Sequence, residues 1–243
     1  MMRALLVRGM IAGVIAAVLA ALFAYVMGEP SVDVAIGFEE SMAHEHGEEL
    51  VSRTVQSTAG LLVAIGVYGV AIGGLLALAF AIAYGRVGSL RPRLTALLVT
   101  GAAFVVVVLM PFLKYPANPP AVGREGTIQS RTALYFAFVA LSIVAGLVAV
   151  YGGRRLTERY DAWTGGIAGC LGYVAVMAVC AWLMPVVDEV PTGFPASTLW
   201  GFRISSLGTQ LTLWTVFGLV FATLAERALT GPAVTSAQRV ANQ

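Results

Sequence analysis

The sequence predicts an all-α polytopic membrane protein that crosses a bilayer about six times and keeps both termini in the cytoplasm. Three observations carry this prediction: the composition, the number of long apolar runs, and the uneven distribution of lysine and arginine. Of the 243 residues, 58% are hydrophobic and only 12% are charged, about half the charged fraction of a soluble protein. This composition favours one membrane domain over residues 1–230.

The apolar runs set the number of spans, because a helix needs about 20 apolar residues to cross the hydrocarbon core. The first run contains Arg8 close to its beginning, from where a long side chain can reach the lipid headgroups. We interpret this run as an uncleaved span, because no clear signal-peptide cleavage site follows it. Six spans are predicted, over residues 4–27, 58–84, 94–113, 132–151, 165–184 and 207–225. If one of these runs lies in the membrane interface, the number of spans is five.

The basic residues set the orientation, because lysine and arginine concentrate on the cytoplasmic side of membrane proteins. In the six-span topology, ten of the fifteen basic residues fall on the side of the N-terminus: Arg3, Arg8, Arg86, Arg91, Arg93, Arg154, Arg155, Arg159, Arg227 and Arg239. That side is therefore predicted to be cytoplasmic, and residues 231–243 form a flexible cytoplasmic tail. The opposite side carries ten of the thirteen acidic residues, as a surface that collects cations would.

Short motifs recur along the chain and suggest three helical hairpins of similar plan. Leu-Met-Pro ends the third span at 109–111 and the fifth at 183–185, while Ser-Arg-Thr precedes two returning spans at 52–54 and 130–132. Arg203 marks a weaker third copy of the second motif. Repeated hairpins suit a bundle that encloses a central site, although such short matches also arise by coincidence among residues common at membrane interfaces.

Three Gly-x-x-x-Gly motifs begin at Gly9, Gly69 and Gly165. Because glycine has no side chain, such pairs let two helix backbones approach closely within a membrane. We expect helix packing at these positions, and no chemistry.

The most polar segment is the outer loop at 28–57, which contains both histidines of the chain. Imidazole and carboxylate together suit divalent first-row metals such as Co, Ni, Zn or Mn. The candidate ligands in this loop are Glu39, Glu40, His44, Glu45, His46 and Glu48. From the sequence, the loop could be either helical or extended. A solvated acidic loop without a metal site is an alternative interpretation of its function.

A second acidic pair, Asp188 and Glu189, follows the fifth span. Lys114 and Tyr115 occupy the corresponding place after the third span. These residues either form the outer vestibule of a cation path or anchor the helix ends at the headgroups. The arginines that precede the returning spans, such as Arg131, either pair with these acids or cap the returning helices.

Several function classes find no support in the sequence. The chain has no Walker motif, no persuasive catalytic triad and only small basic clusters, so we predict no enzyme, no bound cofactor and no nucleic-acid partner. Cys170 and Cys180 lie in one apolar run, separated by a helix rise of roughly 15 Å, which is beyond the reach of a disulfide. The spans hold few polar groups, among them Ser142, Thr212 and Thr215.

Four stretches of the chain resemble the CbtA family of predicted cobalt transporter subunits. They are GEPSVDVAIGFEE at 28–40, KYPANPP at 114–120, DEVPTGFP at 188–195 and LWGFRISSLGTQ at 199–210. KYPANPP and DEVPTGFP are the specific parts, and the resemblance covers nearly the whole chain.

The resemblance implies Co²⁺ uptake across a prokaryotic cell membrane, in connection with cobalamin biosynthesis. It also implies a small one-span partner subunit, CbtB, and metal capture by His44, His46 and the neighbouring glutamates. The alternative is a membrane scaffold or assembly protein that transports nothing and binds a partner through its outer loops. The scarcity of polar groups within the spans favours this alternative, because a cation path needs ligands at mid-membrane.

Overall fold

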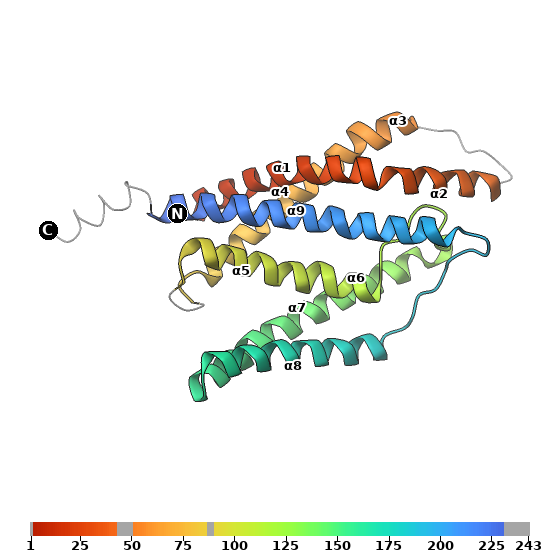
Figure 1. The fold of residues 1–243 in the computed structure, drawn as a ribbon. Helices are drawn as coiled ribbons and strands as arrows, with labels where there is room; N and C mark the ends of the chain where they lie inside the picture. Colours follow the sequence, from red (N-terminus) through yellow and green to blue (C-terminus); the bar gives the residue numbers. More distant parts are fainter. Residues whose placement is uncertain (1, 43–50, 87–89, 231–243) are drawn as a thin grey trace. The chain divides into compact units, whose positions relative to one another are not determined.

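A computed structural model of the chain describes residues 2–42, 51–86 and 90–230 (Figure 1). Within them the fold is all-helical, and six helices are long and apolar enough to cross a membrane. This confirms the predicted all-α fold class and the predicted number of helices that can cross a membrane. Their bounds are Met2–Met27, Arg53–Ala83, Pro92–Lys114, Ile128–Arg159, Ala162–Leu183 and Ala196–Thr230.

Two of these six helices are interrupted by a π-helical turn. The second consists of α3 (Arg53–Val55), η1 (Gln56–Gly60) and α4 (Leu61–Ala83), and the third of α5 (Pro92–Phe104), η2 (Val105–Leu109) and α6 (Met110–Lys114). The uninterrupted spans are α1 (Met2–Met27), α7 (Ile128–Arg159), α8 (Ala162–Leu183) and α9 (Ala196–Thr230). A short 3₁₀ turn, η3 (Glu125–Thr127), precedes α7.

The predicted spans lie within these helices to within a residue, but some of the helices extend well beyond the apolar runs. Helix α9 begins at Ala196, whereas the run predicted from hydropathy begins at residue 207. Hydropathy detects only the part of a helix that lies in hydrocarbon. A polar extension of a membrane helix therefore escapes a prediction based on apolar length.

Part of the predicted outer loop is a helix, α2 (Glu29–Met42). Its first turn contains Glu29 and Pro30, and both residues suit the beginning of a helix. A carboxylate there interacts favourably with the helix dipole, and proline has no N–H to leave unsatisfied at that position. The sequence left the choice between helix and extended chain open, and over these fourteen residues the chain is helical.

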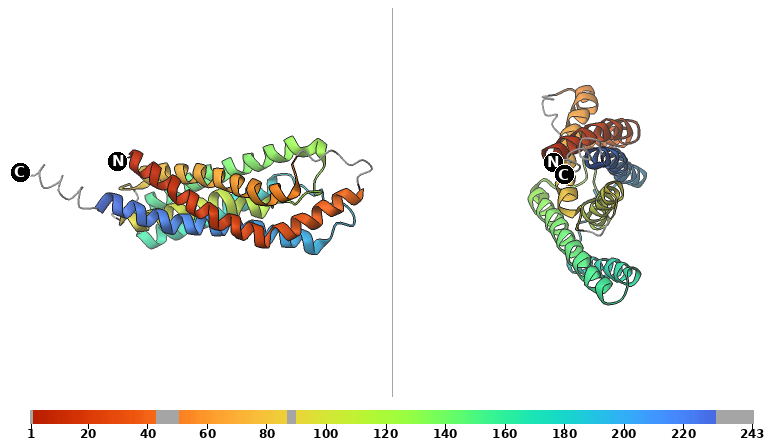
Figure 2. Two further views of the ribbon diagram at one scale, coloured as in Figure 1. Left: turned by 90° about the horizontal axis from the view of Figure 1, so that it is seen from above. Right: turned by 90° about the vertical axis from the view of Figure 1, so that its left-hand side faces the viewer.

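The chain divides into two compact units, Met1–Ala103 with Trp200–Gln243, and Phe104–Leu199. In the first unit α1 packs closely against α4, and the two helices can be followed together in Figures 1 and 2. A Cβ atom added to Gly69 would lie 2.6 Å from the carbonyl oxygen of Gly13, and Gly9 and Gly73 are in equally close contact. The two glycine motifs therefore form one helix–helix contact, as predicted.

Aromatic rings from α4 and α9 fill the interior of the same unit. Phe80 and Phe221 meet edge to face with their ring centroids 5.4 Å apart, and Phe217 stacks on Phe221 at 5.3 Å. All three side chains are at most 1% exposed. Offset and edge-to-face pairs of this kind contribute about 0.5–1.5 kcal/mol each beyond their burial.

In the second unit α7 packs against α8 after a turn at Tyr160 and Asp161. The Asp161 carboxylate accepts hydrogen bonds from the backbone N–H of Trp163 and Thr164 at 2.8 and 2.9 Å, and so caps the first turn of α8. A Cβ atom at Gly169 would lie 3.0 Å from the Ala149 carbonyl oxygen on α7. The third glycine motif is thus also a helix contact, as expected.

Candidate functional site

The predicted metal ligands of the outer loop fall into two groups. Glu39 and Glu40 lie on the last turns of α2 and are exposed. Adjacent residues on a helix do not face each other, so these two carboxylates are not directed at one point. The four remaining predicted ligands, His44, Glu45, His46 and Glu48, lie outside the described residues. Among the residues that are described, no three His, Cys, Asp or Glu side chains gather in a way that could hold a metal.

Of the second acidic pair, Glu189 is held firmly in place. Its Oε2 atom accepts hydrogen bonds from the Arg124 N–H and from the Thr127 hydroxyl, both at 2.8 Å. The guanidinium of Arg131 lies 3.4 Å from the same oxygen, so the predicted pairing of this arginine with the acidic pair is observed. Asp188, the neighbouring residue, is exposed.

These contacts keep the Glu189 carboxylate ionised. The hydrogen bond from the Arg124 N–H and then that from the Thr127 hydroxyl lower the pKa of Glu189, while partial burial acts in the opposite direction. A metal ligand must be deprotonated. Because all three partners contact Oε2, Oε1 is the oxygen that this carboxylate can offer to a cation.

Lys114 and Tyr115 connect the end of α6 to the end of α8. The Lys114 ammonium donates a hydrogen bond to the Met184 carbonyl oxygen at 2.9 Å, and the Tyr115 hydroxyl donates to the Pro185 carbonyl oxygen at 2.8 Å. Helix α8 ends at Leu183, so the ammonium lies at the negative end of its dipole. Lys114 thus has a structural role that the sequence did not reveal.

A further ion-pair cluster connects α2 to the beginning of α3. Arg53 pairs with both Glu29 and Asp33, and its distance to the Asp33 carboxylate is 2.9 Å. The Glu29 side chain is 13% exposed and that of Asp33 is 63% exposed, so Glu29 is the more enclosed partner. The i, i+4 spacing of the two acids was the sequence signal that could have indicated a shared partner.

A buried polar network lies inside the second unit. Ser142 on α7 is fully buried, and its hydroxyl donates to the Val106 carbonyl oxygen at 2.6 Å. The same hydroxyl hydrogen-bonds with the Tyr173 hydroxyl on α8 at 2.7 Å. The sequence identified Ser142 as a polar residue within a span but did not identify its partners.

Pro111 explains why the Val106 carbonyl needs this partner. In an α-helix the Met110 N–H would donate to Val106, but in the π-turn it donates to the Val105 carbonyl instead. The next residue, Pro111, has no N–H to offer. The Ser142 hydroxyl therefore satisfies a carbonyl that its own helix leaves without a donor, as a membrane environment requires. A proline inside an apolar run was the signal for this feature.

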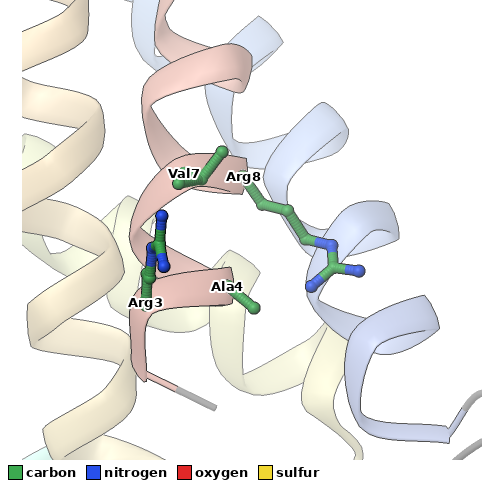
Figure 3. A pocket seen from close by; sticks show the side chains of 4 residues that line it. All are labelled: Arg3, Ala4, Val7 and Arg8. Atoms are coloured by element: carbon green, nitrogen blue, oxygen red, sulfur yellow. The ribbon is translucent and has the colours of Figure 1, made fainter.

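A shallow hollow at the beginning of α1 is lined by Arg3, Ala4, Val7 and Arg8 (Figure 3). The two guanidinium groups extend to either side of the small apolar residues between them. Positive charge of this kind attracts anionic headgroups and repels metal cations. We therefore do not assign the hollow to a metal site.

The six spans define a multi-pass helical membrane protein, and the anchored carboxylate of Glu189 lies outside those spans. The sequence model of the CbtA family, described as "probable cobalt transporter subunit (CbtA)", matches residues 2–226. The chain belongs to this family. No curated protein and no solved structure matches it.

Proposed function

We propose that this protein carries Co²⁺ into the cell and that its outer acidic and histidine-bearing segments capture the ion. The observation that carries the proposal is the family match over residues 2–226, because CbtA proteins are probable cobalt transporter subunits. Two features of the chain support it: the histidines and carboxylates of segment 28–57, and the anchored, ionised carboxylate of Glu189.

Capture is proposed to use two sets of ligands. His44 and His46, with Glu39, Glu40, Glu45 and Glu48, supply the nitrogen and oxygen donors that a borderline first-row ion accepts. Asp188 and the Oε1 atom of Glu189 supply a second, oxygen-only set. Since the outer loop contains no Cys and no ligand spacing of the zinc-finger or HExxH type, we propose weak and exchangeable binding, as a carrier requires.

The membrane potential is a sufficient energy source for such uptake. Each elementary charge gains about 2.3 kcal/mol per 100 mV when it moves to the negative side. A dication therefore gains about twice that amount. Inward movement needs no nucleotide hydrolysis by this chain, which has no Walker motif.

The family description names a subunit, so a transporter of this kind includes other chains. We propose that the partner is the small one-span protein CbtB and that the cobalt serves cobalamin biosynthesis in a prokaryotic cell membrane. A partner that supplies further ligands would compensate for the scarcity of polar groups within the spans of this chain.

Radioactive cobalt uptake into cells that express this chain, alone and with the partner, tests the proposal. We expect uptake that exceeds that of cells without the chain, and a large loss when His44 and His46 are both replaced by Ala. Glu158→Gln, a substitution on the predicted cytoplasmic side of α7, is the matched control and should leave uptake unchanged. Protein amounts in the membrane are compared in parallel.

Absence of uptake in cells where the chain and its partner are both correctly inserted would refute transport. The scaffold interpretation then becomes the better account, and it rests on the scarcity of polar groups in the spans. Co-purification of a partner that is lost when the outer segment is altered, without any change in metal content, would support that second function.

A further inference from the structure

One face of α8 carries a stripe of metal-capable side chains. Tyr173, Met177 and Cys180 follow one another at steps of four and three residues, which places them on the same side of the helix, and Met184 follows directly after the helix ends at Leu183. Met177 is 1% exposed and Tyr173 is 8% exposed, so this face is directed into the interior of the second unit.

Cys180 and Met184 pack against the same buried cluster as Tyr173 and Met177, and Met110 on α6 joins them from the opposite helix. Four sulfur-bearing side chains therefore pack in or against one buried cluster formed by residues of α6, α7 and α8. At the inner end of the stripe the donors become oxygens, because the Tyr173 hydroxyl lies 2.7 Å from the Ser142 hydroxyl.

The composition of this cluster differs from that of an ordinary apolar core. The chain has eight methionines and two cysteines among 243 residues, yet four of these ten side chains meet in a cluster of twelve residues. The cluster, all of it in the described part of the chain, contains no leucine or isoleucine. Those two residues fill most cores because their rotamers are well defined, whereas methionine is flexible and polarisable.

We propose that Met110, Met177, Cys180 and Met184 form a sulfur-lined binding step for transition-metal ions on a path through the second unit. The inference rests on the proposed transport function and names the part of the chain that selects the ion. Thioether and thiolate sulfur favour late transition metals, whereas Mg²⁺ and Ca²⁺ require oxygen ligands. The step therefore excludes the abundant hard cations that an acidic outer surface attracts equally well.

The row of side chains from Tyr173 to Met184 extends over a considerable length of the helix axis. Met184 lies four residues before Asp188, and Tyr173 lies eleven residues before Met184, a helix rise of roughly 16 Å. That distance is about half of the hydrocarbon core. An ion that leaves the carboxylate of Asp188 thus meets sulfur donors in sequence and then the hydroxyl pair at Tyr173.

Binding at Cys180 has a defined proton balance. The thiol loses its proton to solvent as the sulfur–metal bond forms, so one proton is released for each ion bound through this residue. Reprotonation of the thiol releases the ion. No redox change and no further reactant is needed.

Absorption spectroscopy of the full-length protein in lipid nanodiscs, titrated with Co²⁺ alone, tests this assignment. Coordination by a thiolate produces a near-ultraviolet sulfur-to-cobalt charge-transfer band, which nitrogen and oxygen ligands do not produce. We expect the band in the wild type and its loss in Cys180→Ser. Cys170→Ser is the matched control, because Cys170 lies on the same helix but is exposed, and this variant should keep the band.

Met177→Leu should retain the band but require a several-fold higher Co²⁺ concentration, since the substitution keeps the volume and removes one sulfur. A hundredfold excess of Mg²⁺ should leave the titration unchanged. Absence of the band in the wild type, its survival in Cys180→Ser, or an equal loss in Cys170→Ser would overturn the assignment.

The Co²⁺ titration tests the sulfur site and the uptake assay tests transport, so a negative result in one does not decide the other. A charge-transfer band without any cellular uptake would leave the sulfur site standing and refute transport. Uptake by a protein that shows no band would support transport and overturn the sulfur-lined step.

Discussion

Replacement of Ser142 by Ala tests the assignment of the buried network in the second unit. The substitution removes the donor at 2.6 Å from the Val106 carbonyl oxygen and the partner at 2.7 Å from the Tyr173 hydroxyl. A buried acceptor left without a donor costs about 1–3 kcal/mol, whereas an average hydrogen bond between membrane helices contributes about 0.6 kcal/mol. Because Ser142 is fully buried, we expect a loss near the middle of the range for an unsatisfied acceptor, about 2 kcal/mol.

The double variant with Pro111→Ala isolates the cause of that loss. An alanine in place of Pro111 restores a backbone N–H close to the Val106 carbonyl, so the oxygen no longer depends on the Ser142 hydroxyl. In the Pro111→Ala background, Ser142→Ala should therefore cost less, and the two substitutions should be coupled by about 1 kcal/mol. The remaining cost comes from the Tyr173 hydroxyl, which loses its partner in either background.

The free energy of unfolding, measured by SDS titration of the purified protein in mixed micelles, provides the four values of this cycle. Thr212→Ala is the control, because the Thr212 hydroxyl donates to the Gly208 carbonyl within its own helix at 2.8 Å. Its effect should be additive with Pro111→Ala. Additivity of Ser142→Ala and Pro111→Ala, within about 0.5 kcal/mol, would refute the role assigned to the proline.

Three further substitutions test other parts of the fold. Gly69→Ala should destabilise the protein by about 1–3 kcal/mol, because its Cβ would lie 2.6 Å from a carbonyl oxygen on α1. Gly66→Ala, with open space around its Cβ, should not destabilise it, and equal losses would contradict the close contact. Glu29→Gln should lower the free energy of unfolding by about 1–2 kcal/mol, and Asp33→Asn should lower it by less than about 1 kcal/mol. Glu29 is expected to matter more because it is the more enclosed partner of the same arginine. The reverse order in SDS titrations would refute this. Since the pKa of Glu189 is lowered in the folded state, its stabilisation is complete above the ordinary pKa of about 4.3 and is lost as the pH falls through the folded value. Glu189→Gln should flatten the acid side of a melting-temperature profile, and an unchanged profile would contradict the assignment.

The sequence was sufficient for the spans and the glycine contacts for a simple physical reason. Hydrocarbon selects directly for apolar length, and close backbone approach selects directly for glycine. Each feature therefore leaves a local signal, such as the run that became α8 or the motif that begins at Gly69. The orientation and the plan of three hairpins stay predictions, because their signals concern the membrane sides and the arrangement of whole helices.

The features that the sequence missed depend on contacts between distant residues. Ser142 and Tyr173 are 31 residues apart, and only the packing of α7 on α8 brings their hydroxyl groups together. The partners of Arg53 were also unexpected, because α2 was predicted as part of a loop. A polar helix outside the hydrocarbon has no apolar run to indicate it, so the i, i+4 spacing of Glu29 and Asp33 indicates a shared partner only once the segment is known to be helical.

The positive charge of Lys114 is favourable for the structure and unfavourable for the proposed transport of a cation. Its ammonium stabilises the end of α8 through the Met184 carbonyl oxygen, yet Met184 is also the outermost sulfur of the proposed path, so an entering dication has to pass a positive charge. At roughly 8 Å and an effective dielectric constant of about 20, that repulsion is about 4 kcal/mol. Lys114→Gln keeps a donor for the carbonyl and removes the charge, so we expect a faster initial uptake of cobalt, by up to about a thousandfold if passage of this residue limits the rate, with little change in stability. Lys114→Arg, which keeps the charge, should behave like the wild type. If Lys114→Gln leaves the uptake rate unchanged while the protein remains folded, the ion does not pass this residue, and the path lies elsewhere in the protein or in its partner.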